Sequence, residues 1–415
     1  MCIRDRLGTS ESLSEPWAPP GDNALRHDVQ ILADAGIIKS PVAAWPIPWA
    51  TIVADLSDAT LPDGGSPSVT GAFARVRARM QRVLQGSGPV FNARMAASSS
   101  PRRIRNFQST PRDDGELQAG VSWMGQRFAV GAQITAVADP EDNKTFRADG
   151  SYAAVVIGNQ ILSAGVRDRW WVPGWEGSLI YSSNARPMPS FSLERNVAKA
   201  FESKWLSWIG PWNYSLVYGY LDDDRTVNDA RFLGFRVGIR PLNDLEIGLT
   251  RTAQWCGDDR PCDLDTFWDL VKGKDNRGDE GVTLDNEPGN QLAALDIRWT
   301  SPVGDGPYAL YTQWAAEDEA SGTPSRWVGL IGAEVWGVLD TPWLQGDWRV
   351  HLEASDSASE FYEDQVRFDY TYEHFIYQTG YRYRGRAIGH PMDNDGQMVS
   401  IGGTLVDNAD RSWNG

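Results

Sequence analysis

The chain has 415 residues, 55 acidic and 39 basic, which gives a formal net charge of -16 at pH 7. Nucleic-acid-binding proteins normally carry a basic patch, so we expect no nucleic-acid partner. The mean hydropathy is -0.41, and no segment approaches the about 20 consecutive apolar residues that a transmembrane helix needs. The composition therefore excludes a bundle of transmembrane helices.

The first residues carry no recognisable targeting signal. Met1–Arg6 matches nothing further along the chain, and no apolar segment precedes the first residues that look folded. A secretory signal would contain such a segment. We therefore expect residues 1–14 to be a non-native or disordered start, with the natural start missing.

Residues 15–88 predict a small helical module. Asp22 and Gly36 bracket an apolar series at Leu25, Val29 and Leu32, which is the spacing of a helix with an N-cap and a glycine stop. His27 falls on the polar side of this helix, where we expect it to be exposed.

An extended connector and two further helices follow in this module. Trp45-Pro46-Ile47-Pro48-Trp49 must be extended, because each proline fixes φ and removes a hydrogen-bond donor. We expect a short helix through Ile52 and Leu56 and a third from about Val69 to Leu84. The arginines of the third helix are interpreted as a solvated face rather than a functional one. They are Arg75, Arg79 and Arg82.

From about residue 89 the apolar spacing changes from a period of 3.6 to a period of 2. Such alternation predicts half-buried antiparallel strands. The clearest windows are Leu117–Trp123, Phe128–Ala136, Tyr214–Tyr220, Leu233–Ile239, Leu245–Leu249, Ala293–Trp299, Tyr308–Trp314 and Trp348–Ala354.

The two faces of these strands differ in a way that favours a membrane barrel over a soluble β-domain. One face is apolar with Tyr or Trp at strand ends, and the other carries Arg, Glu, Asp, Gln and Gly. An outer-membrane barrel has an apolar outer face, aromatic girdles and a wet interior. Polar loops at Asp139–Gly150, Cys256–Gly289 and Glu317–Ser325 fit its long connections. We predict a mostly-β, transmembrane antiparallel β-barrel over residues 89–415.

The sequence offers little catalytic chemistry. None of its four histidines forms a metal-binding or nucleophile motif, so we predict no enzyme, no cofactor and no metal. The carboxylate clusters at Asp222–Asp224, Asp258–Asp259 and Asp279–Glu280 are better interpreted as solvated turns than as a glycosidase pair. Cys256 and Cys262 bracket a short polar loop, which suggests a disulfide in an oxidising compartment.

Two segments could bind a sugar or an anion. The first, Arg169–Pro189, combines tryptophan faces with polar tips, as sugar-binding surfaces do; an aromatic girdle followed by a turn explains it equally well. Its candidate residues are Arg169, Trp170, Trp171, Trp175, Asn184 and Arg186.

The second segment, Tyr381–Asp395, alternates Tyr and Arg. On one strand this alternation would place Arg382, Arg384 and Arg386 on a single face as an anion-attracting ladder. Pairing with acidic residues of neighbouring strands is the other interpretation. The remaining candidates of this segment are His390, Asp393, Asn394 and Asp395.

Four segments together resemble the capsule assembly Wzi family, outer-membrane β-barrel lectins of Gram-negative bacteria. They are Gly21–Gly36, Trp45–Trp49, Arg169–Arg195 and Tyr381–Asp395. The resemblance implies a barrel of about 18 strands in the complete protein, with the helical module in the periplasm. Because Asp410–Gly415 ends in a predicted turn rather than a strand, we expect the last strands to be missing.

The family resemblance also implies a function. It implies a non-enzymatic lectin that binds capsular polysaccharide or exopolysaccharide, contacts outer-membrane lipid, acts as a monomer and helps to retain the capsule. Three rival hypotheses remain: an outer-membrane porin for sugars or anions, a surface carbohydrate-active enzyme, and a soluble secreted β-protein.

Overall fold

The structure is a computed structural model, and it describes residues 15–59, 66–84, 88–273, 283, 287, 289–320 and 323–415. The predictions for residues 1–14 and for Asp279–Glu280 lie outside the described residues. The helices are α1 (Asn23–Asp34), α2 (Trp49–Ser57), α3 (Pro67–Leu84) and α4 (Leu264–Lys272), with one 3-10 turn, η1 (Ser207–Ile209).

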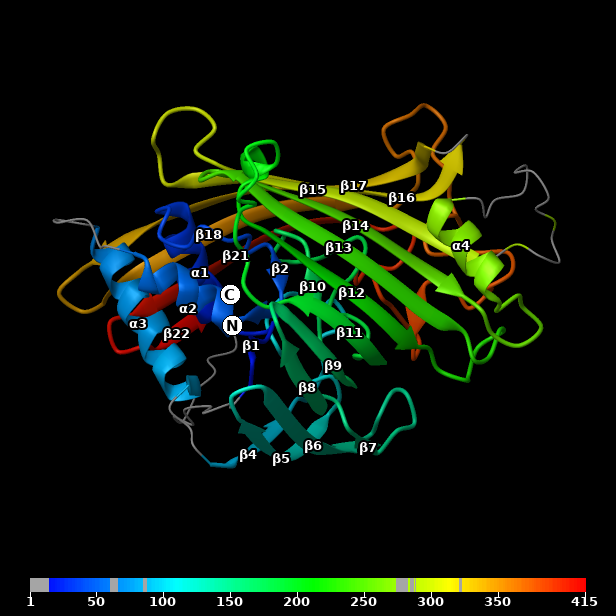
Figure 1. Cartoon of the computed structure of the whole chain (residues 1–415), viewed down its shortest axis with the longest axis horizontal. Helices are drawn as coiled ribbons and strands as arrows, with labels where there is room; N and C mark the ends of the chain where they lie inside the picture. The colour runs from blue at the N-terminus through cyan, green and yellow to red at the C-terminus, as the bar shows by residue number, and fades with distance from the viewer. Residues whose placement is uncertain are drawn as a thin grey trace.

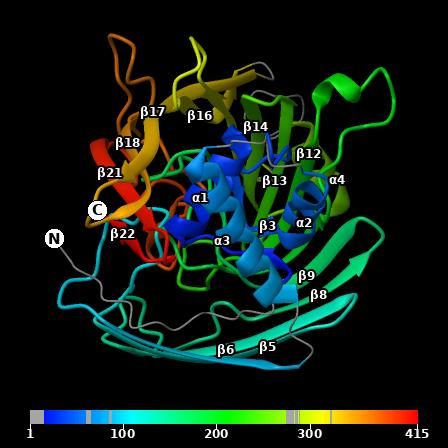
Figure 2. The ribbon, with the colours of Figure 1, turned by 90° about the vertical axis from the view of Figure 1, so that its left-hand side faces the viewer.

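One antiparallel sheet of 16 strands dominates the fold and curves around the helices (Figures 1 and 2). Its strands are β4 (Val90–Ala97), β5 (Gly115–Met124), β6 (Phe128–Ala138), β7 (Phe146–Arg147), β8 (Tyr152–Ile157), β9 (Gln160–Val166), β11 (Pro189–Arg195), β12 (Trp212–Tyr220), β13 (Arg231–Leu242), β14 (Leu245–Trp255), β15 (Gly289–Thr300), β16 (Tyr308–Ala320), β17 (Thr323–Asp340), β18 (Gln345–Asp356), β21 (Gln397–Asp407) and β22 (Ser412–Asn414). Each of the eight predicted windows lies in one of them. In the described part of the chain, β4 and β22 end the strand order without pairing with each other.

The sheet is polar inside and apolar outside. On β13, Arg236 and Arg240 are buried in the interior, whereas Phe235, the neighbour that precedes Arg236, is 45% exposed on the outer face. On β4, Phe91 is 79% exposed. A soluble β-sandwich buries its apolar face, while a membrane barrel turns that face to lipid. The predicted β-barrel class is therefore confirmed. No helix in the described ranges is long and apolar enough to cross a membrane.

The two ends of the barrel have different connections. The strands are joined mostly by short connections at the end that carries α1–α3, here called the helix end (left in Figure 1), with the longer connection 196–211 as the exception. Longer connections cluster at the opposite end, here called the loop end, which includes α4. The long loops of the loop end are 98–114, 139–151, 167–188, 221–230, 256–288 and 357–396.

Helix α1 lies within the ring of strands (Figure 2), and its residues from Ala24 to Ala33 are all buried. Its predicted ends are confirmed: the Asp22 side chain accepts a hydrogen bond from the backbone N–H of Leu25 at 3.1 Å, and Gly36 has φ +69°. An amphipathic helix normally exposes its polar face. Here the polar barrel wall surrounds the helix, so both faces are covered.

Because the barrel interior is polar, two predictions of exposure are wrong. His27 is fully buried. Arg75 of α3 is also buried, where its guanidinium contacts carboxylate oxygens of Asp28 on α1 and Asp347 on β18, each at 2.7 Å. Local periodicity identifies the polar face of a helix but not the charged wall that covers it.

Three local predictions also need correction. The expected loop Glu317–Ser325 lies largely in β16 and β17, because backbone ladder pairing continues beyond the apolar alternation. The predicted terminal turn contains β22, which pairs with Thr404–Val406. The loop Cys256–Gly289 contains α4, whose N-cap Asp263 accepts hydrogen bonds from two backbone N–H groups.

Short strands fasten the N-terminal segment to the interior loops. The proline-rich connector is extended, as predicted, and forms β2 (Ala44–Trp45) and β3 (Ile47–Pro48). β3 pairs with β1 (Trp17–Ala18), and β2 pairs with β10 (Trp170–Trp171). The N-terminal segment and loop 167–188 therefore share one hydrophobic cluster inside the barrel.

Candidate functional site

The tryptophans of loop 167–188 fill the barrel interior. Trp170 is fully buried and packs edge-to-face on Phe107 with ring centroids 5.6 Å apart. Trp171 is buried against Tyr181, with centroids 5.0 Å apart. These rings face neither solvent nor the outer surface, so they form neither an exposed stacking surface nor a girdle.

Trp175 connects this loop to the barrel wall and to α1. Its indole Nε1 donates to Glu334 Oε2 at 2.8 Å, and its ring stacks on His351. The Arg26 guanidinium of α1 lies 4.0 Å from the centre of the Trp175 ring. Burial, partly offset by the Glu334 charge, lowers the pKa of Arg26 to about 10. Trp175 is thus held on several sides inside the molecule.

Three polar candidates also lie in the interior. The buried Arg169 contacts Glu194 at 3.1 Å, and the Asn184 amide nitrogen donates to the Ala387 carbonyl at 2.9 Å. His390 is fully buried, with Nε2 3.1 Å from the Ser355 hydroxyl, and burial lowers its pKa to about 3. These side chains are packed against protein in this structure, and their proposed role in polysaccharide binding stays a prediction.

The structure contradicts the predicted arginine ladder. Tyr381–Arg386 is a tight hairpin, not one strand: β19 (Arg382–Tyr383) pairs with β20 (Arg386–Ala387). Arg384 and Gly385 form the turn with φ values of +48° and +77°. A reversal of the chain between the arginines sends their side chains to different neighbours.

Arg382 belongs to a loop network with the last candidates. Its guanidinium donates to Asp393 at 2.7 and 2.9 Å and also contacts Glu373. The amide of Asn394 donates to Glu373 at 3.3 Å, and Asp395 accepts from the backbone N–H of Asp369 at 2.6 Å. Burial would lower the pKa of Arg382, but Glu373 and Asp393 raise it above its usual value. The network orders loop 357–396.

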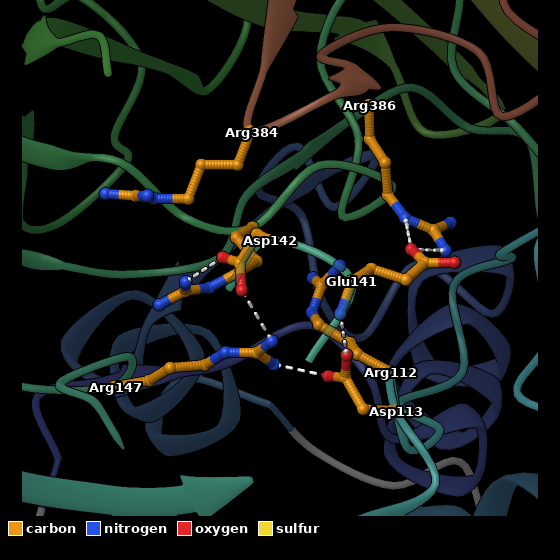
Figure 3. A pocket seen from close by; sticks show the side chains of 8 residues that line it. Arg112, Asp113, Glu141, Asp142, Arg147, Arg384 and Arg386 are labelled. Atoms are coloured by element: carbon orange, nitrogen blue, oxygen red, sulfur yellow. Dashed lines mark hydrogen bonds and ion pairs between the residues drawn. The ribbon is translucent and has the colours of Figure 1, made fainter. Parts of the chain in front are cut away.

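Four long loops meet in a pocket at the loop end, here called the cationic pocket (Figure 3). Three of the predicted residues line it, and five further residues were not predicted. The lining residues are Arg112, Asp113, Glu141, Asp142, Arg147, Arg186, Arg384 and Arg386.

Most charges of the cationic pocket are paired with one another. Arg147 contacts Asp113 at 2.5 Å and Asp142 at 3.0 Å. Arg386 reaches Glu141 at 2.6 Å (Figure 3). These pairs connect loop 98–114, loop 139–151 and the hairpin, so they fix the shape of the pocket.

Arg186 and Arg112 complete the lining. Arg186 contacts Asp142 and donates to Asp149 at 2.7 and 2.9 Å. Burial would raise the pKa of Asp142, but Arg186 and Arg147 lower it below its usual value, so this carboxylate stays charged. Arg112 donates to three backbone carbonyls of residues 183–185.

Arg384 differs from the other arginines of the pocket. Its Nε donates to the Tyr383 hydroxyl at 3.3 Å, and its guanidinium lies 5.4 Å from the Tyr383 ring centre. Within the described residues it forms no ion pair, and Figure 3 shows it reaching across the pocket away from the paired groups. The lining holds five arginines and three carboxylates. Outside the lining, Asp149 pairs with Arg186 and Asp168 pairs with Arg112. Arg384 is therefore the one lining guanidinium without an ion pair among the described residues, and it is available to a ligand.

Sequence reasoning missed the acidic and basic residues that complete the pocket. The loop Asp139–Gly150 was recognised as polar, but nothing in it indicated that Glu141 and Asp142 meet arginines about 40 to 245 residues away along the chain. The only local signal was the charged run Arg112-Asp113-Asp114. Ion pairs between distant loops leave no periodic pattern in the sequence.

The structure joins Cys256 and Cys262 by a disulfide at the start of the α4 loop, with the two Cα atoms 4.6 Å apart. Asp258 and Asp259 lie in the same loop. Across the described ranges, no three His, Cys, Asp or Glu side chains are grouped so that they could hold a metal ion.

Comparison with known proteins gives a family and a matching fold. A family model described as capsule assembly protein Wzi matches residues 85–405. A Klebsiella pneumoniae protein, described as an uncharacterized 55.8 kDa protein in the cps region, is 33% identical over 344 residues. The match covers 81% of this chain and 65% of that protein, so this chain spans less than two thirds of that relative.

Among solved structures, Wzi of Escherichia coli is similar with a TM-score of 0.80 and 30% identity, over 96% of this chain and 84% of that chain. That protein is described as an outer membrane protein involved in group 1 capsule assembly and as a carbohydrate-binding β-barrel. An anion-selective porin from Comamonas acidovorans aligns over 70% of this chain and 73% of that chain, at 9% identity. Its TM-score of 0.33 supports no argument.

Proposed function

Because this chain belongs to the capsule assembly protein Wzi family, we propose that it is an outer-membrane lectin that binds capsular polysaccharide or exopolysaccharide. It retains the polymer at the cell surface without chemical change. The loop end faces outward, the helix end with α1–α3 faces the periplasm, and the protein acts as a monomer. The apolar outer face of the strands supports the membrane location.

The cationic pocket is the observation that carries this proposal. Five arginines converge here although the whole chain is strongly acidic, and Arg384 among them has no ion-pair partner within the described residues. Arg384 presents a guanidinium that can donate two hydrogen bonds to a sugar carboxylate. The neighbouring ion pairs hold the loops in place, so little ordering is needed when a polymer binds. A polymer with repeated acidic sugars would be attracted to this end of the barrel.

The filled interior argues against a porin. The packing of Trp175 between Arg26 and His351 occupies the space where a channel would run. Helix α1 is held in the interior by Asp34, which contacts Arg298 at 2.6 Å and Arg349 at 3.3 Å. A porin needs an open aqueous channel. We therefore expect no sugar- or anion-sized conductance from the folded protein in planar bilayers.

The decisive test measures binding of the purified, refolded barrel to an immobilised acidic capsular polysaccharide, with neutral dextran as the comparison surface. In Arg384→Gln the charge-assisted hydrogen bonds are lost. Such bonds are worth about 1.5–3 kcal/mol, so we expect an about 10- to 100-fold loss of affinity. Heat-modifiable migration on a gel verifies that each variant has folded.

Arg367→Gln is the matched control. Arg367 lies in the same loop, 49% exposed, and pairs with Glu360 outside the pocket. This variant should bind the polysaccharide as the parent protein does. Equal losses in both variants would mean that the attraction is diffuse, and unchanged binding in Arg384→Gln would remove the cationic pocket from the proposal.

A further inference from the structure

The loop between β11 and β12 has an unusual surface for a connection at the helix end. Residues 196–211 contain η1 and stand out from the ring of strands (bright green, upper right in Figure 2). Trp205 is 88% exposed and Trp208 66% exposed, with Leu206 exposed between them. Exposing two neighbouring tryptophans to water is unfavourable, and in membrane proteins such residues gather at the lipid interface.

An aromatic stack fixes this loop to the outer wall of the barrel. Trp212 and Tyr214 alternate with the inward-facing Val217 of β12, so they point outward. Phe201 of the loop stacks on Trp212 with ring centroids 4.7 Å apart and planes 16° apart. Trp212 in turn stacks on Tyr214. The loop therefore continues the apolar outer face of the barrel beyond the strand ends.

Positive charge accompanies the exposed aromatic residues. Arg195 lies 3.9 Å from the Trp212 ring centre and donates to the Lys199 carbonyl at 3.1 Å. Lys199 and Lys204 are both exposed, and neither forms an ion pair among the described residues. One carboxylate, Glu202, opposes these three cations within the loop. Only six lysines occur in the whole chain, and two are here.

From this arrangement we propose that residues 196–211 form an interfacial anchor for anionic glycerophospholipid. Trp205, Leu206 and Trp208 enter the boundary between headgroups and acyl chains, and Lys199 and Lys204 contact the lipid phosphates. The leaflet concerned is the one at the helix end. The inference rests on membrane insertion of the barrel but not on polysaccharide binding.

Depth-dependent quenching tests the anchor. A fluorophore is attached at Ser207→Cys, an exposed position between the two tryptophans, in a background carrying Cys2→Ser. The protein is refolded into vesicles of phosphatidylethanolamine and phosphatidylglycerol. We expect strong quenching by lipids that carry a quencher near the headgroup, and at least twofold weaker quenching by aqueous iodide than at the exposed Asp364→Cys of the loop end.

One further label distinguishes failure of the anchor from failure of membrane insertion. A label at Ile331→Cys, in the middle of β17 and 56% exposed, reports insertion of the barrel through quenching by deep lipid quenchers. If it is quenched while position 207 responds to iodide like position 364, the anchor is wrong. If the label at position 331 is not quenched by the lipid quenchers, the proposed membrane location is wrong, and the anchor proposal is then wrong as well.

Loop variants test the contributing side chains. Trp205→Ser with Trp208→Ser should expose the label at position 207 to iodide without changing the label at position 331. Lys199→Gln with Lys204→Gln should remove the difference between vesicles with and without phosphatidylglycerol. Lipid quenching that survives the tryptophan changes, or a charge response that survives the lysine changes, would contradict the assigned roles.

Discussion

At the helix end two arginines of the barrel wall share a pair of carboxylates, whereas at the loop end one arginine of the cationic pocket has no carboxylate partner among the described residues. Arg298 on β15 contacts both Asp34 of α1 and Glu334 of β17. Arg349 on β18 contacts the same two carboxylates. In the cationic pocket, Arg384 forms no ion pair within the described chain.

This difference separates charges that hold the structure from charges that remain available to a ligand. A buried guanidinium with two carboxylates has satisfied its charge within the protein, and it has little capacity left for another anion. An arginine at an open pocket without a carboxylate keeps its donors free. Both ends are rich in arginine, so the pairing rather than the residue type indicates the function.

The largest expected effect comes from removing the Asp34 charge. In Asp34→Asn, Arg298 and Arg349 lose a buried partner, which typically costs about 3–5 kcal/mol. We expect the free energy of unfolding in urea to fall by that amount, and residues of α1 to become accessible to protease. Asp410→Asn is the control, because Asp410 is 36% exposed and pairs with Arg79 at 3.3 Å. It should change stability by less than about 1 kcal/mol.

Acidification should weaken the packing of α1 inside the barrel. Burial, reinforced by the charges of Arg349 and Arg75, lowers the pKa of His27 well below its usual value of 6.5. The stability that neutral His27 contributes is therefore complete above pH 6.5 and decreases as the pH falls below it. The loss can reach about 1.4 kcal/mol per pH unit.

The measurement compares the parent protein with His27→Gln over the range from pH 7.5 to about 5. The difference between their free energies of unfolding should be constant above pH 6.5 and should change steadily below it. A difference that stays constant throughout this range would show that His27 does not titrate with unfolding. The contributions of the other histidines to the pH dependence cancel in this comparison, because both proteins contain them.

A smaller effect should appear when one pocket carboxylate is neutralised. Glu141 is 54% exposed and pairs with Arg386, so Glu141→Gln releases a second guanidinium. Exposed pairs are worth about 0.2–1 kcal/mol. We expect acidic polysaccharide to bind up to about fivefold more tightly, with the gain decreasing at high salt. Glu363→Gln, an exposed change elsewhere at the loop end, should leave affinity unchanged.

The sequence predicted the strands well, because alternation is a property of neighbouring residues. Phe235 and Arg236 show their opposite faces without any knowledge of the rest of the chain. The capped helix α1 was predicted for the same reason. The sequence windows did not include β17, the longest strand at 18 residues, in which glycines interrupt the apolar alternation.

The candidate site was predicted less well. Arg186, Arg384 and Arg386 do meet in one pocket, but Arg382 turns to Asp393 and Glu373 because a hairpin replaces the expected strand. The residues that pair with Arg386 and Arg186 come from a different loop, 139–151. A sequence lists candidate charges, but it does not say which of them are already neutralised.

By itself, the sequence determined that the chain forms two-faced strands and capped helices, since these depend on local spacing and local hydrogen bonds. The two faces of the strands also favoured a barrel with its apolar face outside. Only the tertiary structure decided that α1 with His27 is enclosed by charged walls and that Trp175 fills the interior. Closing a sheet around a helix brings together residues hundreds of positions apart. The free energy of those contacts depends on three-dimensional distance and burial, which no local pattern records.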